Sequence, residues 1–327
     1  MDLSTTYLGL SLKNPIIVAS CGLTETAEQI KQCEQAGAGA VVMKSLLEEQ
    51  IRESEADMEK ELSMHPEVMD YLRADLDMRY GSEKYIKVIQ QAKKEVSIPV
   101  IASVNCYTSK WWTEYARQIE EAGADALELN VYVMPLDFTK NAGDLENMYV
   151  EIVKTVKTQV KIPVALKVSP YFTSFGNFAL KMSDYGVDGL VLFNRFVQPD
   201  IDITALSTKI KPSFDDPVGV GRSLRWIGML SGQLKLDLAA SGGIRNEEVV
   251  IKMLLAGASV VQIASVLYAK GLMRIQEILE GLEKWMAEKH FSSIADFKGR
   301  LNQKHSPQDT SYIRAQYIKA IGGKEKA

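Results

Sequence analysis

The chain has 327 residues, of which 46% are hydrophobic and 24% are charged, and its formal net charge is −4. This ordinary globular composition excludes a largely disordered chain, and the dispersed lysines argue against a nucleic-acid partner. Three cysteines without CxxC spacing and three histidines argue against a disulfide framework and against a metal site. We find neither a secretory leader pattern nor an apolar run of about 18 residues, and therefore expect a cytoplasmic protein without a membrane span.

Short apolar segments recur along the chain and are predicted to be strands. In chain order they cover residues 14–20, 36–44, 97–104, 122–130, 161–168, 185–194, 234–241 and 256–265. Most are continuously apolar, as expected for strands that are buried on both faces. Four of them begin with a small-residue turn such as Ala-Gly-Ala, and two have proline at the entrance, where a strand tolerates it.

Amphipathic helical patterns separate these strands, for example at residues 28–36, 114–122 and 247–256. Eight alternations of strand and helix predict a parallel eight-stranded (β/α)8 TIM barrel, formed by residues 1–327 as a single domain with a flexible tail from about residue 320. An open doubly wound sheet is the alternative, but no G-x-G-x-x-G pattern follows the first strand.

Two connections are too long for simple turns, one after the second strand (45–80) and one after the sixth (195–222). Both follow the carboxyl ends of strands, where barrels of this kind carry their active sites. We therefore expect these long loops to be lids. A closing helix is predicted at residues 271–289.

Polar residues stand at the carboxyl ends of the predicted strands. The first strand ends at Ala19, Ser20, Cys21 and Gly22, and the polar residues at the later strand ends are Lys44 and Ser45, Ser103 and Asn105, Asn130, Lys167 and Ser169, and Asn194. A single lysine at such a position is commonly a side chain that reaches solvent. Two lysines on nearly continuous apolar strands instead predict a charged ligand or partner at the mouth of the barrel.

The last two strands end in ASGGIRN and QIASVLY, a pattern typical of a phosphate site. Gly242 and Gly243 would allow backbone N–H groups to approach phosphate oxygens, and Ala264 and Ser265 would present further N–H groups at the start of a helix. The alternative is that the two glycines only turn the chain.

Several of these segments together carry a family resemblance. YLGLSLKNPIIVAS, MKS, ELN, LKVSPYF, the GGI loop and FSSIADFKGRL occur in the order found in dihydroorotate dehydrogenases, and most closely resemble the soluble class 1 form, from about residue 6 to 301. The resemblance implies an FMN-dependent oxidoreductase of pyrimidine (UMP) biosynthesis that converts dihydroorotate to orotate. It also implies a separate electron acceptor and a homodimer.

The resemblance also implies which residues contact FMN and substrate. The positions that match the cofactor site are Ala19, Ser20, Lys44, Asn130, Lys167, Asn194, Gly221, Gly242, Gly243, Ala264 and Ser265. Lys44, Asn130, Asn194 and Arg195 are the expected substrate contacts. Lys167 and Lys44 would oppose the negative charge of a reduced flavin, and the asparagines would bind the imide edge of a pyrimidine.

The sequence departs from the family at the catalytic base. Family members have cysteine or serine three residues after the fourth-strand asparagine, where this chain has Val133, which cannot remove a proton. Tyr132 is a possible substitute, although an unperturbed tyrosine pKa near ~10 makes it a weak base. In the loop after the second strand, family members have a segment that binds orotate, and this chain has MHPEVMDYL there instead. After Asn194, Arg195 replaces the usual Ser or Thr. Arg195 could hold a carboxylate through its planar guanidinium.

Three functions therefore remain open. The first is a flavin oxidoreductase with dihydroorotate or a changed substrate. The second is a flavin-binding barrel that has lost turnover, which the missing base motivates. The third is an isomerase or aldolase for a phosphorylated metabolite that uses Lys44 or Lys167 without flavin.

Overall fold

The computed structural model describes residues 1–47, 82–105, 109–131, 133, 135–194, 199–210, 217–306 and 312. Within these ranges, parallel strands pair around a closed ring, so the predicted TIM barrel is confirmed. In ring order the strands are β3 (Ile16–Val18), β4 (Ala40–Val42), β6 (Val100–Asn105), β7 (Ala126–Asn130), β8 (Val164–Val168), β9 (Gly189–Leu192), β12 (Asp237–Ser241) and β13 (Val260–Ile263). Each strand lies inside the segment predicted for it except β6, which extends one residue beyond its segment, to Asn105.

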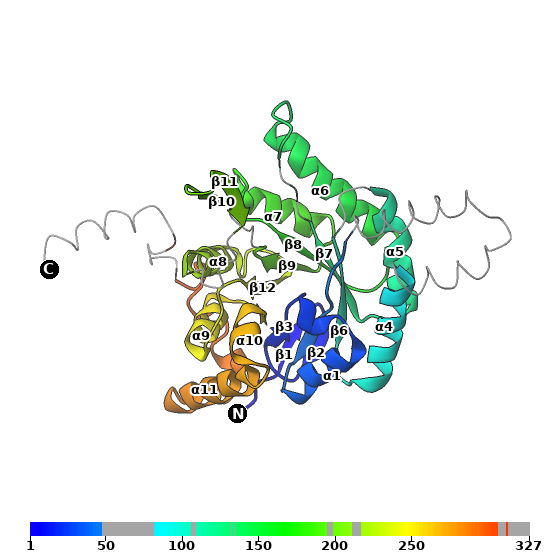
Figure 1. Cartoon of the computed structure of the whole chain (residues 1–327). Coiled ribbons are helices and arrows are strands. Elements are labelled where there is room, and N and C mark those ends of the chain that lie inside the picture. The colour runs from blue at the N-terminus through cyan, green and yellow to red at the C-terminus, as the bar shows by residue number, and fades with distance from the viewer. Residues whose placement is uncertain are drawn as a thin grey trace, which may run out of the picture.

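Helices surround the ring of strands (Figure 1). They are α1 (Ala27–Gln35), α4 (Ser82–Glu95), α5 (Ser109–Glu121), α6 (Ala142–Lys157), α7 (Phe175–Asp184), α8 (Pro217–Leu230), α9 (Glu247–Ala256), α10 (Ser265–Lys270) and α11 (Arg274–Glu288). The structure also has two short 3-10 helices, η1 (Gly22–Thr24) and η3 (Ile294–Asp296). The predicted closing helix is α11. The predicted tail lies outside the described residues.

The recurring glycine turns between helix and strand have the expected conformation. Gly37, Gly123, Gly186 and Gly257 all have positive φ angles, between 82° and 112°. Residues with a Cβ avoid this left-handed region, so glycine ends each helix and turns the chain into the next strand.

Carboxylates fix the position of neighbouring strand entrances. Asp125 Oδ2 accepts the N–H of Val100 at 2.7 Å, and Asp188 Oδ2 accepts the N–H of Val164 at 2.8 Å. Each carboxylate also forms an ion pair with a lysine of a nearby helix, Asp125 with Lys93 of α4 at 2.6 Å and Asp188 with Lys157 of α6 at 2.7 Å. An aspartate two residues after the turn glycine therefore links one repeat to its neighbour.

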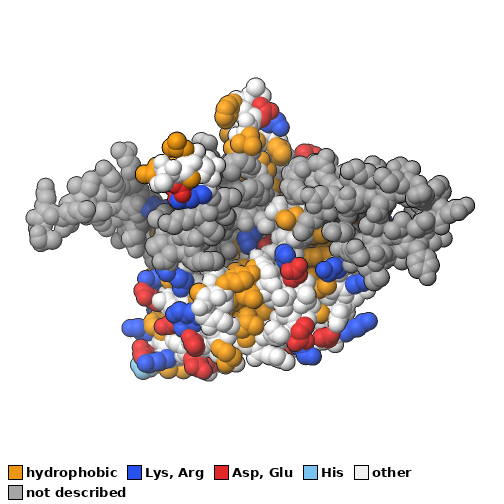
Figure 2. Space-filling model, viewed as in Figure 1, with side chains coloured by type: hydrophobic (Ala, Val, Ile, Leu, Met, Phe, Trp, Pro, Cys, Tyr) orange, Lys and Arg blue, Asp and Glu red, His pale blue; other side chains and the backbone are white. Residues whose placement is uncertain are grey.

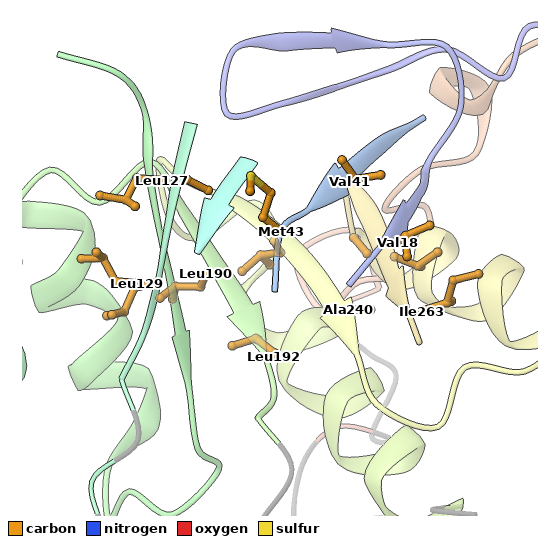
Figure 3. Close-up of a cluster of buried hydrophobic side chains, with 14 of the residues drawn as sticks. Val18, Val41, Met43, Leu127, Leu129, Leu190, Leu192, Ala240 and Ile263 are labelled. Atoms are coloured by element: carbon orange, nitrogen blue, oxygen red, sulfur yellow. The ribbon is translucent and has the colours of Figure 1, made fainter. Parts of the chain in front are cut away.

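Alternate residues of each strand face the helices and form the larger hydrophobic core. Figure 3 shows this layer, with side chains such as Val41, Leu127 and Leu190 on adjacent strands. All three are fully buried. Burying such side chains stabilises the fold by about 1.5–3 kcal/mol each relative to an exposed position, before the cost of ordering the chain.

The remaining alternate residues face the barrel interior, whose amino-terminal half is apolar. This lower cluster consists of Tyr7, Leu8, Leu12, Ile17, Ala40, Val42, Ile101, Ala126, Ala165, Val191, Ala239 and Val260. Two residues further along four of the strands stand Ser103, Glu128, Lys167 and Gln262, which are buried and polar. We call these four residues the upper polar layer. Residues two apart on a strand point to the same face, so these four side chains also face the interior. They stand one step closer to the carboxyl ends of the strands than the lower cluster does.

Two antiparallel hairpins were not anticipated from the sequence. The first, β1 (Thr5–Tyr7) with β2 (Leu10–Leu12), supplies Tyr7, Leu8 and Leu12 to the lower cluster and so fills the amino-terminal end of the barrel. The second pairs β10 (Pro199–Asp202) with β11 (Ser207–Ile210).

The second hairpin and the first residues of α8 occupy much of the predicted long loop after the sixth strand, so that connection is more regular than expected. Of the other predicted long loop, only residues 45–47, including β5 (Leu46–Leu47), lie within the described ranges.

Candidate active site at the carboxyl ends of the strands

The predicted polar strand ends meet at one end of the barrel. Asn130 and Lys167 are directly paired at the ends of β7 and β8. Ser241 and Gln262 are paired where β12 and β13 end, immediately before the glycine and Ala264 segments. Parallel pairing therefore places the residues expected to hold the ring of a cofactor and those expected to hold its phosphate on the same edge.

A chain of hydrogen bonds crosses this end of the barrel. The Ser45 hydroxyl lies 3.0 Å from that of Ser20 and 2.8 Å from that of Ser103. The Asn130 amide donates to the Ser45 hydroxyl at 3.4 Å, and the Asn194 amide donates to Asn130 Oδ1 at 2.5 Å. Five side chains from separate strands are thereby connected, which leaves few rotamers open to the two asparagines.

Lys44 and Ser45 stand where strand pairing is interrupted, between β4 and β5. Along β6, Ile101 pairs with Val42 of β4 and Val104 pairs with Leu46 of β5. The backbone of Ser103, between these pairs, is satisfied by Tyr85 of α4. The Tyr85 hydroxyl accepts the Ser103 N–H at 2.7 Å and donates to its carbonyl at 3.0 Å.

Lys44 is the more exposed of the two mouth lysines. Its Nζ lies 2.9 Å from Glu25 Oε2, and the two side chains are 41% and 45% exposed. A pair as exposed as this contributes at most about 1 kcal/mol to stability. Lys44 can therefore exchange Glu25 for another anion at little cost.

Lys167 is buried, with only 9% of its side chain exposed. Its Nζ donates to Gln262 Oε1 at 3.1 Å and lies 3.5 Å from Glu128 Oε1. Gln262 Nε2 in turn donates to Glu128 Oε2 at 2.6 Å. The charge expected at this strand end is thus compensated by a carboxylate two residues before Asn130.

The glycine turn after β12 has the open backbone expected of an anion site. Gly242 and Gly243 have φ angles of 92° and 71°, and a Cβ placed on Gly242 would meet nothing within 4 Å. Helix α10 begins at Ser265, as predicted. Within the described ranges, the N–H groups of Gly243 and Ser265 donate to no other backbone group, so both are available to a ligand. Gly221 lies inside α8, with open space beside it.

Cys21 follows the first strand end close to Lys167. Burial raises the pKa of its thiol, although hydrogen bonds from the Leu23 backbone and the Tyr268 hydroxyl and the nearby Lys167 charge act in the opposite direction. The thiol is therefore mainly protonated near neutral pH.

Two predicted site residues, Tyr132 and Arg195, lie outside the described residues. Val133, in the position of the family's base, packs against the hydrophobic core. Glu128, Gln262 and Glu25 were not predicted. The two-residue period of a strand could have identified Glu128 and Gln262. Each stands two residues before a predicted site residue and therefore points to the same interior face. Glu25 carries no such signal.

Over the ranges that the structure describes, no group of three or more His, Cys, Asp or Glu side chains could hold a metal ion. In the same ranges no helix is long and apolar enough to cross a membrane.

Comparisons with known proteins agree on one family. The family model described as dihydroorotate dehydrogenase matches residues 2–286. The catalytic subunit of dihydroorotate dehydrogenase B (NAD(+)) from Thermoplasma volcanium is 30% identical over 310 residues, covering 91% of this chain and 98% of the relative. The corresponding subunits of Pyrococcus abyssi and Methanocaldococcus jannaschii are 29% and 28% identical, and cover 91% and 89% of this chain and 98% and 95% of their own length.

Proposed function

Since the chain belongs to the dihydroorotate dehydrogenase family, we propose that it is an FMN-dependent oxidoreductase that oxidises a CH–CH bond, with dihydroorotate as its substrate. The observation that carries this proposal is the combination of a buried lysine and two linked asparagines with an open glycine turn on the same barrel edge. A planar, polar ring attached to a phosphate requires both halves of that arrangement.

The glycine turn fits the phosphate of FMN. Gly242 and Gly243 leave the backbone open, and the N–H groups of Gly243 and Ser265 have no backbone acceptor among the described residues. Phosphate oxygens accept such N–H groups well. We therefore assign Gly242, Gly243, Ala264 and Ser265 to phosphate binding.

The other strand ends fit the ring of the cofactor. Lys167 would place a positive charge beside it, and Asn130 and Asn194 would offer hydrogen-bond donors and acceptors. Ala19, Ser20, Lys44 and Gly221 complete the proposed contacts. When bound, FMN would supply the acceptor for the hydride that leaves the substrate.

Substrate binding and proton removal are assigned to side chains around this ring. We assign Lys44, Asn130, Asn194 and Arg195 to the substrate, where Lys44 and Arg195 would bind its carboxylate. Val133 cannot serve as base, so Tyr132 is the residue we assign to proton removal. With an ordinary tyrosine pKa near ~10, this assignment predicts slow turnover that increases with pH.

Partners are proposed from the relatives and from the surface. The Thermoplasma and Pyrococcus relatives are named as catalytic subunits of NAD(+) enzymes. We propose a separate electron-accepting partner, a cytoplasmic location and a homodimer for this chain. Exposed apolar side chains on the β10–β11 hairpin and before α6 favour a protein partner (Figure 2). They include Ile203 at 83%, Leu206 at 87% and Phe138 at 97% exposure. Light scattering of the purified protein tests the dimer.

The test of function is an anaerobic titration of the purified protein. We expect an oxidised-flavin spectrum that bleaches on addition of dihydroorotate, more slowly in Tyr132→Phe. Flavin that dihydroorotate leaves unchanged would favour a changed substrate or the barrel without turnover. Absence of bound or bindable flavin, together with borohydride trapping of a substrate on Lys44 or Lys167, would instead support the isomerase or aldolase alternative.

A further inference from the structure

Lys167, Gln262 and Glu128 form a closed set of contacts inside the barrel. Glu128 and Gln262 are 1% and 2% exposed, and they come from β7 and β13, on different sides of the ring from one another. Buried charges are tolerated only when they are paired and hydrogen-bonded. The three residues satisfy this requirement only as a set.

The contacts leave Gln262 a single orientation. Its amide oxygen must face the ammonium group, which has only donors, and its amide nitrogen must face the carboxylate, which has only acceptors. A flipped amide would oppose both neighbours. Gln262 therefore links the lysine and the carboxylate in a fixed geometry across the barrel.

The set has unused bonding capacity. An ammonium group has three donors, and among the described residues Lys167 uses one for Gln262 and approaches Glu128 at 3.5 Å with another. Glu128 Oε1 is buried and has no hydrogen-bond partner there, only this ion pair. One donor of Lys167 thus remains for a ligand at the mouth, while the carboxylate beneath it reduces the net positive charge.

We infer that Glu128 and Gln262 are positioning residues for Lys167, which hold its ammonium toward the cofactor and partly cancel its charge, and so lower the affinity of the bound flavin for electrons. The inference rests on the proposed function. Lys167 touches the cofactor in this proposal, and the other two residues act through it. Removing the negative charge should make the flavin easier to reduce, and removing the amide that holds the Lys167 ammonium apart from Glu128 should make it harder to reduce.

A second set at the opposite end of the barrel provides a matched control. Lys298 Nζ donates to the Ser259 hydroxyl at 2.8 Å, and Ser259 donates to Asp237 Oδ1 at 2.6 Å. Asp237 Oδ2 also accepts the N–H of Leu8 in the lower cluster. This lysine, bridge and carboxylate have the same chemistry, but they stand where β12 begins, away from the strand ends.

The experiment compares Glu128→Gln, Gln262→Met and Asp237→Asn, each loaded with FMN. Two readouts are used: sulfite affinity, which increases with positive charge near the flavin ring, and the reduction potential against a reference dye. Both are measured at the same neutral pH for every variant.

We expect Glu128→Gln to bind sulfite on the order of tenfold more tightly and to shift the potential upward, because one charge acting over ~10 Å at an effective dielectric of ~20 has an effect of that size. Gln262→Met should shift both readouts in the opposite direction, because no amide then holds the Lys167 ammonium apart from Glu128, and Asp237→Asn should move neither. Equal values for wild type, Glu128→Gln and Gln262→Met would overturn the inference while leaving the flavin function intact.

The design separates this inference from the proposed function. A wild-type protein that binds no FMN refutes the function itself, and the inference fails with it. A Glu128→Gln variant that does not fold leaves Gln262→Met as the test, since that change keeps both original charges and removes only the amide between them. An unchanged potential in that variant would then overturn the inference.

Discussion

The two halves of the barrel interior have opposite chemistry although the same strands build them. In the lower cluster Val42 and Ala126 are fully buried among other apolar side chains. Two residues later in the sequence stand Lys44, just beyond the end of β4, and Glu128 in β7. The change from apolar to polar within one step of the strand period shows that packing determines the lower half, whereas charge and hydrogen-bond pairing determine the upper half.

Two tyrosines show the same contrast, Tyr7 inside the barrel and Tyr85 on the helix side of the strands. The Tyr7 hydroxyl, in the lower cluster, is buried and has no hydrogen-bond partner among the described residues. The Tyr85 hydroxyl, beside the upper polar layer, both donates to and accepts from the Ser103 backbone. A polar group in the lower half is therefore a cost to stability, and one in the upper half supports the strand geometry.

The largest effect is expected from a lysine placed inside the lower cluster. Val42→Lys should destabilise the fold by roughly 4 kcal/mol or more, because it buries a charge among the apolar side chains of this cluster. Lys44→Val, two residues later in the sequence, should change stability by about 1 kcal/mol or less, because its ion pair is half-exposed. Urea denaturation followed by circular dichroism measures both. Similar losses in the two variants would contradict the comparison.

Next in size is the buried pair of the upper polar layer. Glu128→Leu alone should destabilise the flavin-free protein by about 3–5 kcal/mol, because it leaves Lys167 buried without its counter-charge. Adding Lys167→Met should recover most of that loss, since no charge is then left unpaired. A double-mutant cycle in urea quantifies the coupling between the two residues. Additive losses would mean that the pair is not coupled.

Alkaline pH should destabilise the protein through its buried phenols. Burial raises the pKa of Tyr149 to about 12, and burial with the charges of Glu128 and Asp237 raises the pKa of Tyr7. Unfolded tyrosine ionises near ~10, so this stability is complete below about pH 10 and is lost as the pH rises toward 12.

The share of Tyr149 in this loss is about 2–3 kcal/mol at pH 12, at roughly 1.4 kcal/mol per pKa unit. Urea midpoints measured between about pH 8 and 11 follow the onset of the loss. Tyr149→Phe and Tyr7→Phe should each flatten the decline, and an unchanged slope in both variants would contradict the assignment.

The smallest expected effects have opposite signs. At neutral pH, Tyr7→Phe should stabilise the fold by about 1 kcal/mol, because it removes a buried hydroxyl without a partner. Tyr85→Phe should destabilise it by about 1–2 kcal/mol, because the Ser103 backbone loses both hydrogen bonds. Thermal and urea unfolding of the two variants give the comparison. A destabilised Tyr7→Phe protein would show that its hydroxyl has a partner such as a bound water.

Much of the fold could be predicted because its signals are local. Each barrel strand is a short apolar run, and the turn glycines stand at fixed places in the repeat. The β1–β2 hairpin was missed, because two strands of three residues give no clear period. The hairpin β10–β11 and the early start of α8 were missed because the segment after the sixth strand is polar and has no apolar pattern.

The residues of the candidate site could be predicted, but the side chains that each of them contacts could not. Lys44 and Lys167 were recognised as equivalent strand-end charges, yet one is half-exposed beside Glu25 and the other is buried against Glu128. The partners of Lys167 are 39 positions before it and 95 positions after it in the sequence, so no local pattern connects them.

The sequence by itself determined the barrel, the order of its strands and the end at which polar side chains gather, because strand period, turn glycines and strand-end residues are local properties. Only the tertiary structure decided which polar side chains meet, because closing the ring brings β7, β8 and β13 together across its interior. Closure of the ring therefore also determines the contacts of Lys167, whose charge is compensated by Glu128 and whose ammonium group is oriented by Gln262. Burial then makes each of these contacts obligatory, since an unpaired charge inside the barrel is far more costly than one in water.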